Sequence, residues 1–263
     1  MELNIKGKVA VVTASSKGLG RAAAEALAAE GVNLAICSRD KDRIQETADD
    51  LQAKYNVDVL LDVCDVTDKS SIESFKNKVI DHFKTCHILF TNAGGPPPGK
   101  VEDFKGEDFK QALDLNLLST INLVYAFLPF MKNQRWGRIL ASTSITVKQP
   151  IPTLALSNVS RVGVVAFIKS LALEMAPFNV TANTLAPGYI MTERVDDLLK
   201  NQAKTENISY EDALERLIQK IPVKTIGKPE DFGALAAFLA SEQAAYITGE
   251  TILIDGGLYN GLM

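Results

Sequence analysis

Residues 8–30, KVAVVTASSKGLGRAAAEALAAE, decide the fold. The β-branched run 8–13 predicts a buried strand, the glycines that follow predict a tight turn, and the alanine-rich stretch 21–30 predicts a helix. In such a unit the backbone can approach a pyrophosphate, which then lies on the free N–H groups of the helix N-terminus. A glycine turn alone is weak evidence, but this one stands between the strand and the helix that a dinucleotide site requires.

The turn supplies many of the residues that we expect to contact the dinucleotide. These residues are Thr13, Ser15, Ser16, Lys17, Gly18, Leu19 and Gly20. Ala14 replaces the first glycine of the usual pattern. We expect Ala14 to keep a negative φ angle, so that the replacement costs little.

Strand-like and helix-like segments alternate to the end of the chain without a linker or repeat. The expected strands are 8–13, 32–38, 57–62, 88–91, 137–142, 179–185 and 251–254. The expected helices are 21–30, 41–55, 69–84, 106–131 and 157–175, the fourth bent or stopped near Pro129. Repeated strand–helix–strand units imply right-handed crossovers and parallel strands covered by helices on both faces. We predict one α/β domain over residues 1–263, with a doubly wound, seven-stranded parallel sheet of Rossmann type and a substrate lid at 192–221.

The bulk composition narrows the class of protein. A chain of 263 residues with 46% hydrophobic content can bury a sheet on both faces, and a net charge of −4 without a basic run argues against nucleic acid as a partner. The start lacks a signal peptide, and the longest apolar run, 162–168, is too short to span a bilayer, so we expect no membrane. The three widely spaced cysteines indicate buried thiols of a cytoplasmic protein, and His82 and His87 have no ligand cluster that would predict a metal site.

The end of the second strand bears on the choice between the two nicotinamide dinucleotides. An NAD site usually places a carboxylate there, against the ribose 2′-hydroxyl. This chain has Ser38 and Arg39 at that point, with Lys17 in the glycine turn. Two cations suit a 2′-phosphate, because arginine can hold phosphate through paired, charged hydrogen bonds. The sequence favours NADP(H), while Asp40, one position further on, keeps NAD possible.

With these residues the chain resembles the short-chain dehydrogenase/reductase family, and further motifs extend the match over nearly its whole length. They are Asp65-Val66, Asn92-Ala93-Gly94, Asn116, Ser144, and Pro187-Gly188 followed by Ile190 and Thr192. The resemblance implies that Asp65 and Val66 contact adenine, that the segment from Pro187 wraps the nicotinamide, and that Ser144 is the serine of the active site. By overall appearance the chain is similar to 3-oxoacyl-[acyl-carrier-protein] reductases. The implied reaction is reduction of a carbonyl, or oxidation of an alcohol, on a small molecule.

The chain departs from the family at the reacting groups. The family has a tyrosine thirteen residues after the serine and a lysine four residues later; counting from Ser144 gives Ser157 and Arg161. In the family the tyrosine gives a proton to the carbonyl oxygen, while the lysine lowers the tyrosine pKa and holds the nicotinamide ribose. Serine is a poor general acid, and the loss of one typically costs about 10²–10⁴-fold in rate. Arg161 can still bind ribose hydroxyls, but it does not give up its own proton near neutrality.

Several readings of this active site stay open. Lys148 or Tyr189 could donate the proton instead, although each can equally be a surface lysine or a packing tyrosine. Ser144 and Asn116 could still polarise a carbonyl by hydrogen bonding. The stiff loop 94–99 is expected to shape the mouth of the pocket. The alternative to an enzyme is a weak or inactive dinucleotide-binding protein, acting as a sensor or an inactive subunit.

The helix expected at 157–175 is apolar nearly all round. Such a helix is buried on more than one side, either within the domain or against a second chain. Gly163 would let a neighbouring helix approach closely. We therefore expect a homodimer or homotetramer formed through this helix, with simple burial inside the domain as the alternative.

Overall fold

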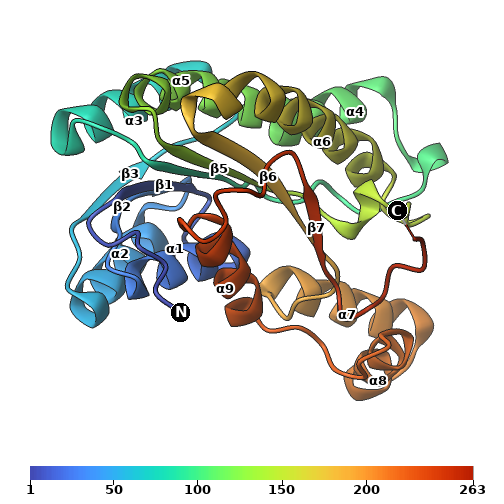
Figure 1. The fold of residues 1–263 in the computed structure, drawn as a ribbon. Helices are drawn as coiled ribbons and strands as arrows, with labels where there is room; N and C mark the ends of the chain where they lie inside the picture. The colour runs from blue at the N-terminus through green and yellow to red at the C-terminus, as the bar shows by residue number, and fades with distance from the viewer. Residues whose placement is uncertain (263) are drawn as a thin grey trace.

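The computed structural model describes residues 1–262, and its centre is one seven-stranded, all-parallel sheet (Figure 1). The strand order is β3-β2-β1-β4-β5-β6-β7. The strands are β1 (Val9–Thr13), β2 (Asn33–Ser38), β3 (Val59–Val63), β4 (Ile88–Thr91), β5 (Gly137–Ser142), β6 (Val180–Pro187) and β7 (Thr251–Ile254). This sheet confirms the predicted fold class. Helices make the crossovers between its strands, and strands that helices bury on both faces pair in parallel.

Two layers of helices cover the sheet (Figure 1). On one face lie α1 (Gly18–Ala29), α2 (Lys41–Tyr55) and α9 (Pro229–Leu239), whose buried side chains pack in one core cluster. On the other face lie α3 (Lys69–Phe83), α5 (Ser119–Gln134) and α6 (Ala155–Met175). The short helix α4 (Gly106–Leu113) directly precedes the turn that leads into α5. The helices α7 (Glu193–Glu206) and α8 (Tyr210–Lys220) stand apart and share a small core of their own.

The expected helix 106–131 differs most from the structure. It is divided by a π-helical turn, Asp114–Leu118, and then runs on to Gln134 without stopping at Pro129. Proline removes one backbone hydrogen bond, but Phe127 and Met131 on either side of it are fully buried and hold α5 on the sheet. Helix α9 was not predicted from the sequence.

By length and mean hydropathy alone, the helical stretch Gly106–Gln134 could cross a bilayer, although no single apolar run suggested it. Its apolar residues have another explanation, because Leu123, Val124 and Phe127 belong to the core cluster on the sheet. All three cysteines are free and buried, as expected.

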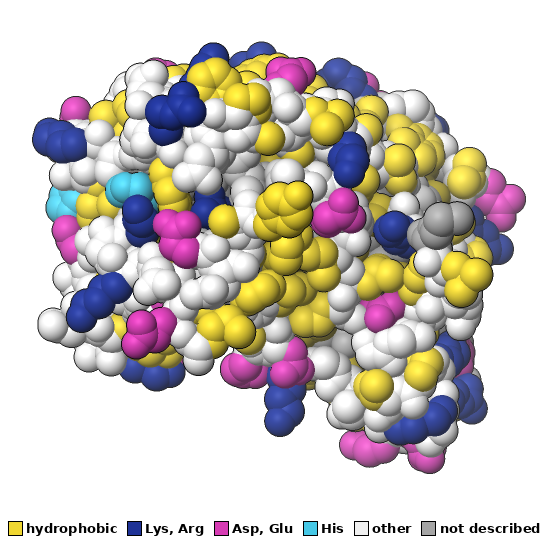
Figure 2. Space-filling view, in the orientation of Figure 1, with side chains coloured by type: hydrophobic (Ala, Val, Ile, Leu, Met, Phe, Trp, Pro, Cys, Tyr) yellow, Lys and Arg dark blue, Asp and Glu magenta, His cyan; other side chains and the backbone are white. Residues whose placement is uncertain are grey.

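Helix α6 turns one side to the sheet and leaves another exposed. Val164 and Ile168 are buried, whereas Val159 is 50% and Val162 is 48% exposed. Gly163 does allow a close approach, but of the same chain: a Cβ at this position would lie 2.8 Å from a methyl carbon of Leu117. On the face seen in Figure 2, hydrophobic side chains gather across the middle, where Figure 1 places β7 and α9.

Candidate active site

A cavity of about 590 Å³ opens at the carboxyl edge of the sheet. Its walls come from the segments that follow β1, β2, β3, β4, β5 and β6. Crossovers leave β1 and β4 towards opposite ends of the sheet, so their carboxyl ends separate and leave a crevice between them. The fold therefore places a ligand site where the sequence motifs converge.

The glycine turn corrects the expectation for Ala14. This residue has φ +48°, in the left-handed region, and not the negative φ expected for alanine. Gly20 is needed for a different reason: a Cβ there would lie 2.4 Å from the carbonyl oxygen of Ala14. The turn is thus folded back tightly on the start of α1.

The turn residues divide into two groups. Ser16, Lys17, Gly18 and Leu19 line the cavity. The other three lie behind the wall: the Thr13 hydroxyl donates to the Asn92 carbonyl at 2.8 Å, the Ser15 hydroxyl donates to the Val12 carbonyl at 3.0 Å, and Gly20 packs on Ala14. Thr13, Ser15 and Gly20, which were also predicted to contact the dinucleotide, position the turn and are not among the residues that line the cavity.

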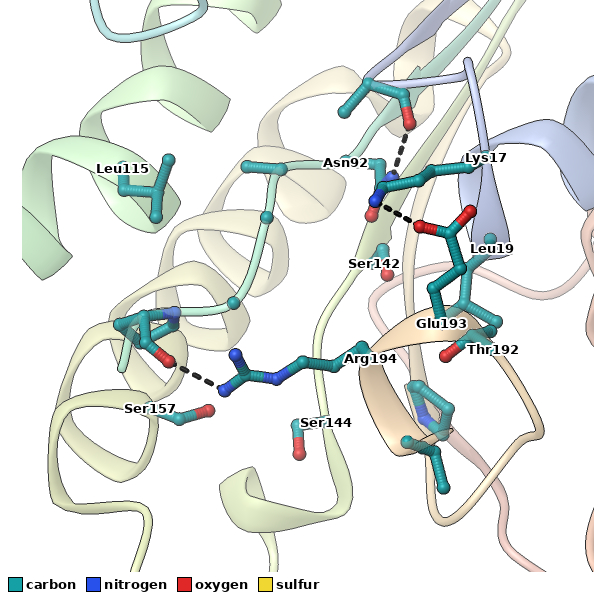
Figure 3. Close-up of a pocket in the computed structure, with 18 of the residues that line it drawn as sticks. Lys17, Leu19, Asn92, Leu115, Ser142, Ser144, Ser157, Thr192, Glu193 and Arg194 are labelled. Atoms are coloured by element: carbon teal, nitrogen blue, oxygen red, sulfur yellow. Dashed lines mark hydrogen bonds and ion pairs between the residues drawn. The ribbon is translucent and has the colours of Figure 1, made fainter. Parts of the chain in front are cut away.

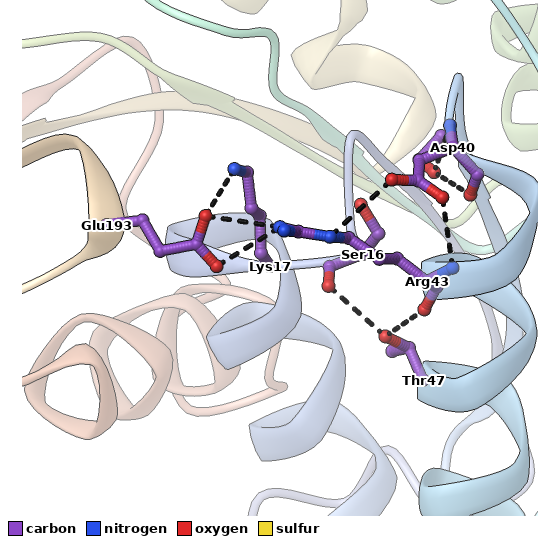
Figure 4. A network of polar contacts seen from close by, with 7 residues as sticks. Ser16, Lys17, Asp40, Arg43, Thr47 and Glu193 are labelled. Carbon is purple, nitrogen blue, oxygen red and sulfur yellow. Dashed lines mark hydrogen bonds and ion pairs between the residues drawn. The ribbon is translucent and has the colours of Figure 1, made fainter.

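A charged network stands at the end of the cavity next to α2 (Figure 4). Glu193 accepts from Lys17 and, at 3.1 and 3.2 Å, from the Arg43 guanidinium. These contacts, with Lys17 first, hold the Glu193 pKa below its ordinary value. Asp40 caps α2 by accepting the Arg43 backbone N–H at 3.1 Å. Arg39 also lines the cavity, and no ion pair involves it within residues 1–262.

All twelve of the other residues expected to hold the dinucleotide also line the cavity. They are Ser38, Arg39, Asp65, Val66, Asn92, Ala93, Gly94, Arg161, Pro187, Gly188, Ile190 and Thr192. Gly188 allows a tight passage, since a Cβ there would lie 2.8 Å from the Asp255 side chain. The Asn92 amide donates to the Ala14 carbonyl at 3.3 Å and so joins the fourth strand to the glycine turn.

The hydroxyl groups of Ser144 and Ser157 lie at the end of the cavity opposite to α2 (Figure 3). Ser144 caps a 3₁₀ turn, Ile145–Val147, by accepting the Thr146 N–H at 3.2 Å, which leaves its own proton free to be donated. Ser157, in the first turns of α6, is 9% exposed, and its hydroxyl lies 3.4 Å from the Thr146 hydroxyl. Both can therefore give hydrogen bonds to an oxygen in the cavity.

Arg161 is a buried cation of the cavity wall. One of its terminal nitrogens donates to the Ser142 and Thr143 carbonyls, each at 3.1 Å. Burial first, and then the positive charge of Arg194, lower its pKa to about 10, so it stays cationic at neutral pH. Within residues 1–262 no carboxylate pairs with it.

Asn116 does not line the cavity, contrary to the expectation that it could polarise a carbonyl. It is buried in the π-helical turn, where its amide donates to the Gly94 carbonyl at 3.3 Å. Its side-chain oxygen accepts from the Ser160 hydroxyl at 2.9 Å. The extra residue of the π-turn aims this side chain at the loop after β4, so Asn116 links that loop to α6.

The two proposed substitute donors have different places. Lys148 is exposed and is not part of the cavity wall. Tyr189 does line the cavity and packs against the core of α7 and α8; burial raises its pKa. Of the two, only Tyr189 can reach a molecule in the cavity.

Sequence reasoning missed three charged residues of the site: Arg43, Glu193 and Arg194. Glu193 and Arg194 are the first residues of α7, directly after the predicted nicotinamide segment, and this position was a signal that they face the cavity. Arg194 donates to the Pro96 carbonyl at 2.8 Å. Pro96 belongs to the loop that was expected to shape the mouth of the pocket, and it does line the cavity.

Comparison with known proteins identifies similar chains over the full length. A family model described as enoyl-(acyl carrier protein) reductase matches residues 13–259. The 3-oxoacyl-[acyl-carrier-protein] reductase FabG of Escherichia coli is 34% identical over 98% of this chain and 99% of its own. L-sorbose reductase from Gluconobacter frateurii, solved with NADPH and L-sorbose, has a TM-score of 0.96 at 30% identity, and the match covers 100% of both chains. An NADPH-bound short chain oxidoreductase from Pseudomonas aeruginosa PAO1, described as containing an atypical catalytic center, has a TM-score of 0.88 at 30% identity over 97% of both chains.

Proposed function

Because this chain belongs to the short-chain dehydrogenase/reductase family, we propose that it is an NADP(H)-dependent oxidoreductase that reduces the carbonyl group of a small molecule or oxidises the corresponding alcohol. One observation carries the proposal: a single cavity runs from the cations Lys17 and Arg39 to the hydroxyls of Ser144 and Ser157. Similarity to reductases solved with NADPH supports the same cofactor here.

The end of the cavity near α2 fits the 2′-phosphate of NADP(H). Lys17, Arg39 and Arg43 bring three cations to it, and the free N–H groups of α1 can take the pyrophosphate. Asp40, which kept NAD possible, is engaged with the backbone and side chain of Arg43. The cofactor supplies or accepts the hydride when it is bound.

We further propose that Ser157 and Arg161 stand where the family has its tyrosine and lysine. Ser144 and Ser157 would then polarise the substrate carbonyl by hydrogen bonds. Arg161 would stabilise the negative charge that develops on that oxygen, because a fixed cation in a buried wall acts with little screening. A similar short chain oxidoreductase is described as containing an atypical catalytic center, and this similarity supports an enzymatic role for a chain whose reacting groups depart from the family pattern.

The proton for the reduced oxygen is proposed to come from Tyr189, or from water, and not from Lys148. Tyr189 lines the cavity, whereas Lys148 is exposed outside it. A tyrosine whose pKa is raised is a weak acid, which fits an enzyme that stabilises the oxyanion first and protonates it afterwards. Asn116 is proposed as a positioning residue that holds the loop after β4.

Three further features of the working protein are proposals. Residues 192–221 act as a substrate lid on a single domain, since α7 and α8 have a core of their own and the first turns of α7 line one side of the cavity. The chain forms a homodimer or homotetramer, supported by the exposed Val159 and Val162 on α6 and by Tyr125 of α5, which is 63% exposed and stacks edge-on against Phe167 of α6. The three free, buried thiols support a cytoplasmic location.

Two measurements test the function. Thermal unfolding with NADPH and with NADH compares their affinities through ligand stabilisation, and NADPH is expected to protect more strongly. NADPH oxidation is then followed with 3-oxoacyl thioesters, ketones and aldehydes, where Tyr189→Phe should slow turnover and Lys148→Ala should not. Equal protection by NADH would contradict the cofactor assignment. Absence of turnover in the wild type, with a gain in Ser157→Tyr/Arg161→Lys, would contradict the proposed active site.

A further inference from the structure

The cavity has an uneven distribution of charge between its two ends. Its carboxylates are Asp40, Asp65 and Glu193, and each has partners at the end next to α2 and β3. The end that holds Ser144 and Ser157 has two arginines, Arg161 and Arg194, and no carboxylate among the cavity residues. Two uncompensated cations at the reacting end favour a negatively charged ligand.

Arg194 is built to reach that end. Its side chain extends from the start of α7 across the cavity, towards the side that holds Ser157 (Figure 3). The guanidinium lies against the backbone of Gly95, where a Cβ would be 3.5 Å from its central carbon, and donates one hydrogen bond to the Pro96 carbonyl. An arginine has five N–H donors in a planar fork, and no other contact occupies the fork of Arg194 within residues 1–262. Its free donors can therefore receive a carboxylate in two-point contact.

The remaining wall of this end is apolar. It is formed by Leu115, Ile145, Ile151, Leu154, Val195 and Leu198. Apolar walls with a few placed polar groups bury the body of a ligand and orient its reacting atoms. The ligand that fits is an aliphatic chain with an oxo group for the serines and an anionic group for Arg194.

We propose that the substrate is an oxo acid with an aliphatic body, whose free carboxylate is bound by Arg194 while its carbonyl faces Ser144 and Ser157. The inference rests on the reductase function proposed above and adds the substrate class. It also separates this chain from an enzyme that takes its substrate as a thioester, which has no free carboxylate at that place. Arg194, at the start of α7, already donates to Pro96 in the loop after β4, so the carboxylate would bind where the proposed lid meets that loop.

The test compares 3-oxohexanoate with its methyl ester in NADPH oxidation, on the wild type, Arg194→Gln and Lys200→Gln. Lys200 is the matched control, because it lies on the same helix, pairs with Asp196 and does not line the cavity. A hydrogen-bonded charge pair gives about 10- to 100-fold in kcat/KM. The wild type and Lys200→Gln should prefer the acid by this factor, and Arg194→Gln should lose the preference. Equal kcat/KM for acid and ester in the wild type, or an equal loss on both in Arg194→Gln, would overturn the proposal.

A binding measurement separates this inference from the proposed function. Thermal unfolding in the presence of NADP⁺ is followed with hexanoate and with hexanamide, neither of which can react. Protection of the wild type by hexanoate alone, absent in Arg194→Gln, is expected whether or not turnover is seen. Equal protection by both compounds would overturn the carboxylate site, whereas failure of the proposed function would appear as a lack of protection by NADP⁺ itself.

Discussion

Glu193→Gln is expected to tighten NADPH binding and to leave NADH binding nearly unchanged. The Glu193 carboxylate bridges Lys17 and Arg43, the two cations that we propose for the 2′-phosphate together with Arg39. A phosphate entering there must break both bridges. The Lys17 and Glu193 side chains are 53% and 54% exposed, so each bridge is a solvent-screened ion pair. Breaking one such pair weakens NADPH binding by a factor of about 1.5 to 5, and breaking both weakens it by a factor of about 2 to 25. Glu193→Gln, which has neither ion pair, should bind NADPH more tightly by the same factor.

The assay is equilibrium titration of both dinucleotides against the wild type and Glu193→Gln, at low and high salt. The ratio of the NADPH dissociation constants should lie in that range at low salt and shrink at high salt, because exposed charges are screened. Glu206→Gln, which removes a carboxylate from the far end of α7, serves as the control. If both dinucleotides tighten equally, or if NADPH binds more weakly to Glu193→Gln, then Glu193 does not compete for the phosphate site and the reasoning is wrong.

Three other predictions follow from the backbone and from the half-buried His87. Ala14→Gly should raise the free energy of unfolding, measured by urea titration, by about 0.5–1 kcal/mol, because glycine tolerates φ +48°. The control Ala10→Gly on β1 should lower it, and a lower free energy of unfolding in both variants would refute this prediction. Gly20→Ala should weaken NADPH binding at least about tenfold and lower the midpoint of unfolding, because its Cβ would meet the Ala14 carbonyl, and normal affinity would contradict the geometry of the turn. Burial, with the Lys8 charge, lowers the His87 pKa to about 4, while its Nδ1 accepts the Val9 N–H at 3.1 Å. The unfolded chain, with a His pKa near 6.5, binds the proton more readily, so stability should fall as the pH drops from 6.5 to 4. The two pKa values alone imply about 2.6 kcal/mol, and the solvent exposure of the ring reduces the expected fall to about 1–2 kcal/mol. His87→Asn should show a flatter dependence if this is correct.

The sheet was predictable because the signals for its strands are local. The short apolar segments that became β4, β5 and β7 have their predicted bounds, and apolar residues at helical spacing in the segments between strands indicate the crossover helices. The π-turn at Asn116 was not predictable, because it depends on what the side chain meets across space, Gly94 and Ser160, rather than on propensity. The prediction of a negative φ angle for Ala14 was wrong for the same reason, because tertiary contacts of the turn outweigh the preference of alanine for negative φ.

In the site, the motifs located the cavity and some of its charged residues, but not Arg43, Glu193 or Arg194. Lys17 and Arg39 were found because the choice of dinucleotide depends on a known strand end. Arg43 comes four residues after Arg39, on a helix with many exposed charged side chains, so nothing in the sequence distinguished it from the other charged residues of α2. Glu193 and Arg194 reach the cavity only because α7 begins against it, and Lys148 is absent from it because its 3₁₀ turn points the side chain outward into solvent.

The single reversal of strand order, between β1 and β4, divides the chain into two parts that can be exchanged. Residues up to about Asp65 supply the cations for the dinucleotide, while those from β5 onward supply Ser144, Ser157 and Arg161. A chimera that joins this N-terminal part to the C-terminal part of a relative would therefore keep its cofactor preference and acquire a different chemistry. The chimera has to keep one set of contacts between its two parts, because Glu193 of the second part forms ion pairs with Lys17 and Arg43 of the first.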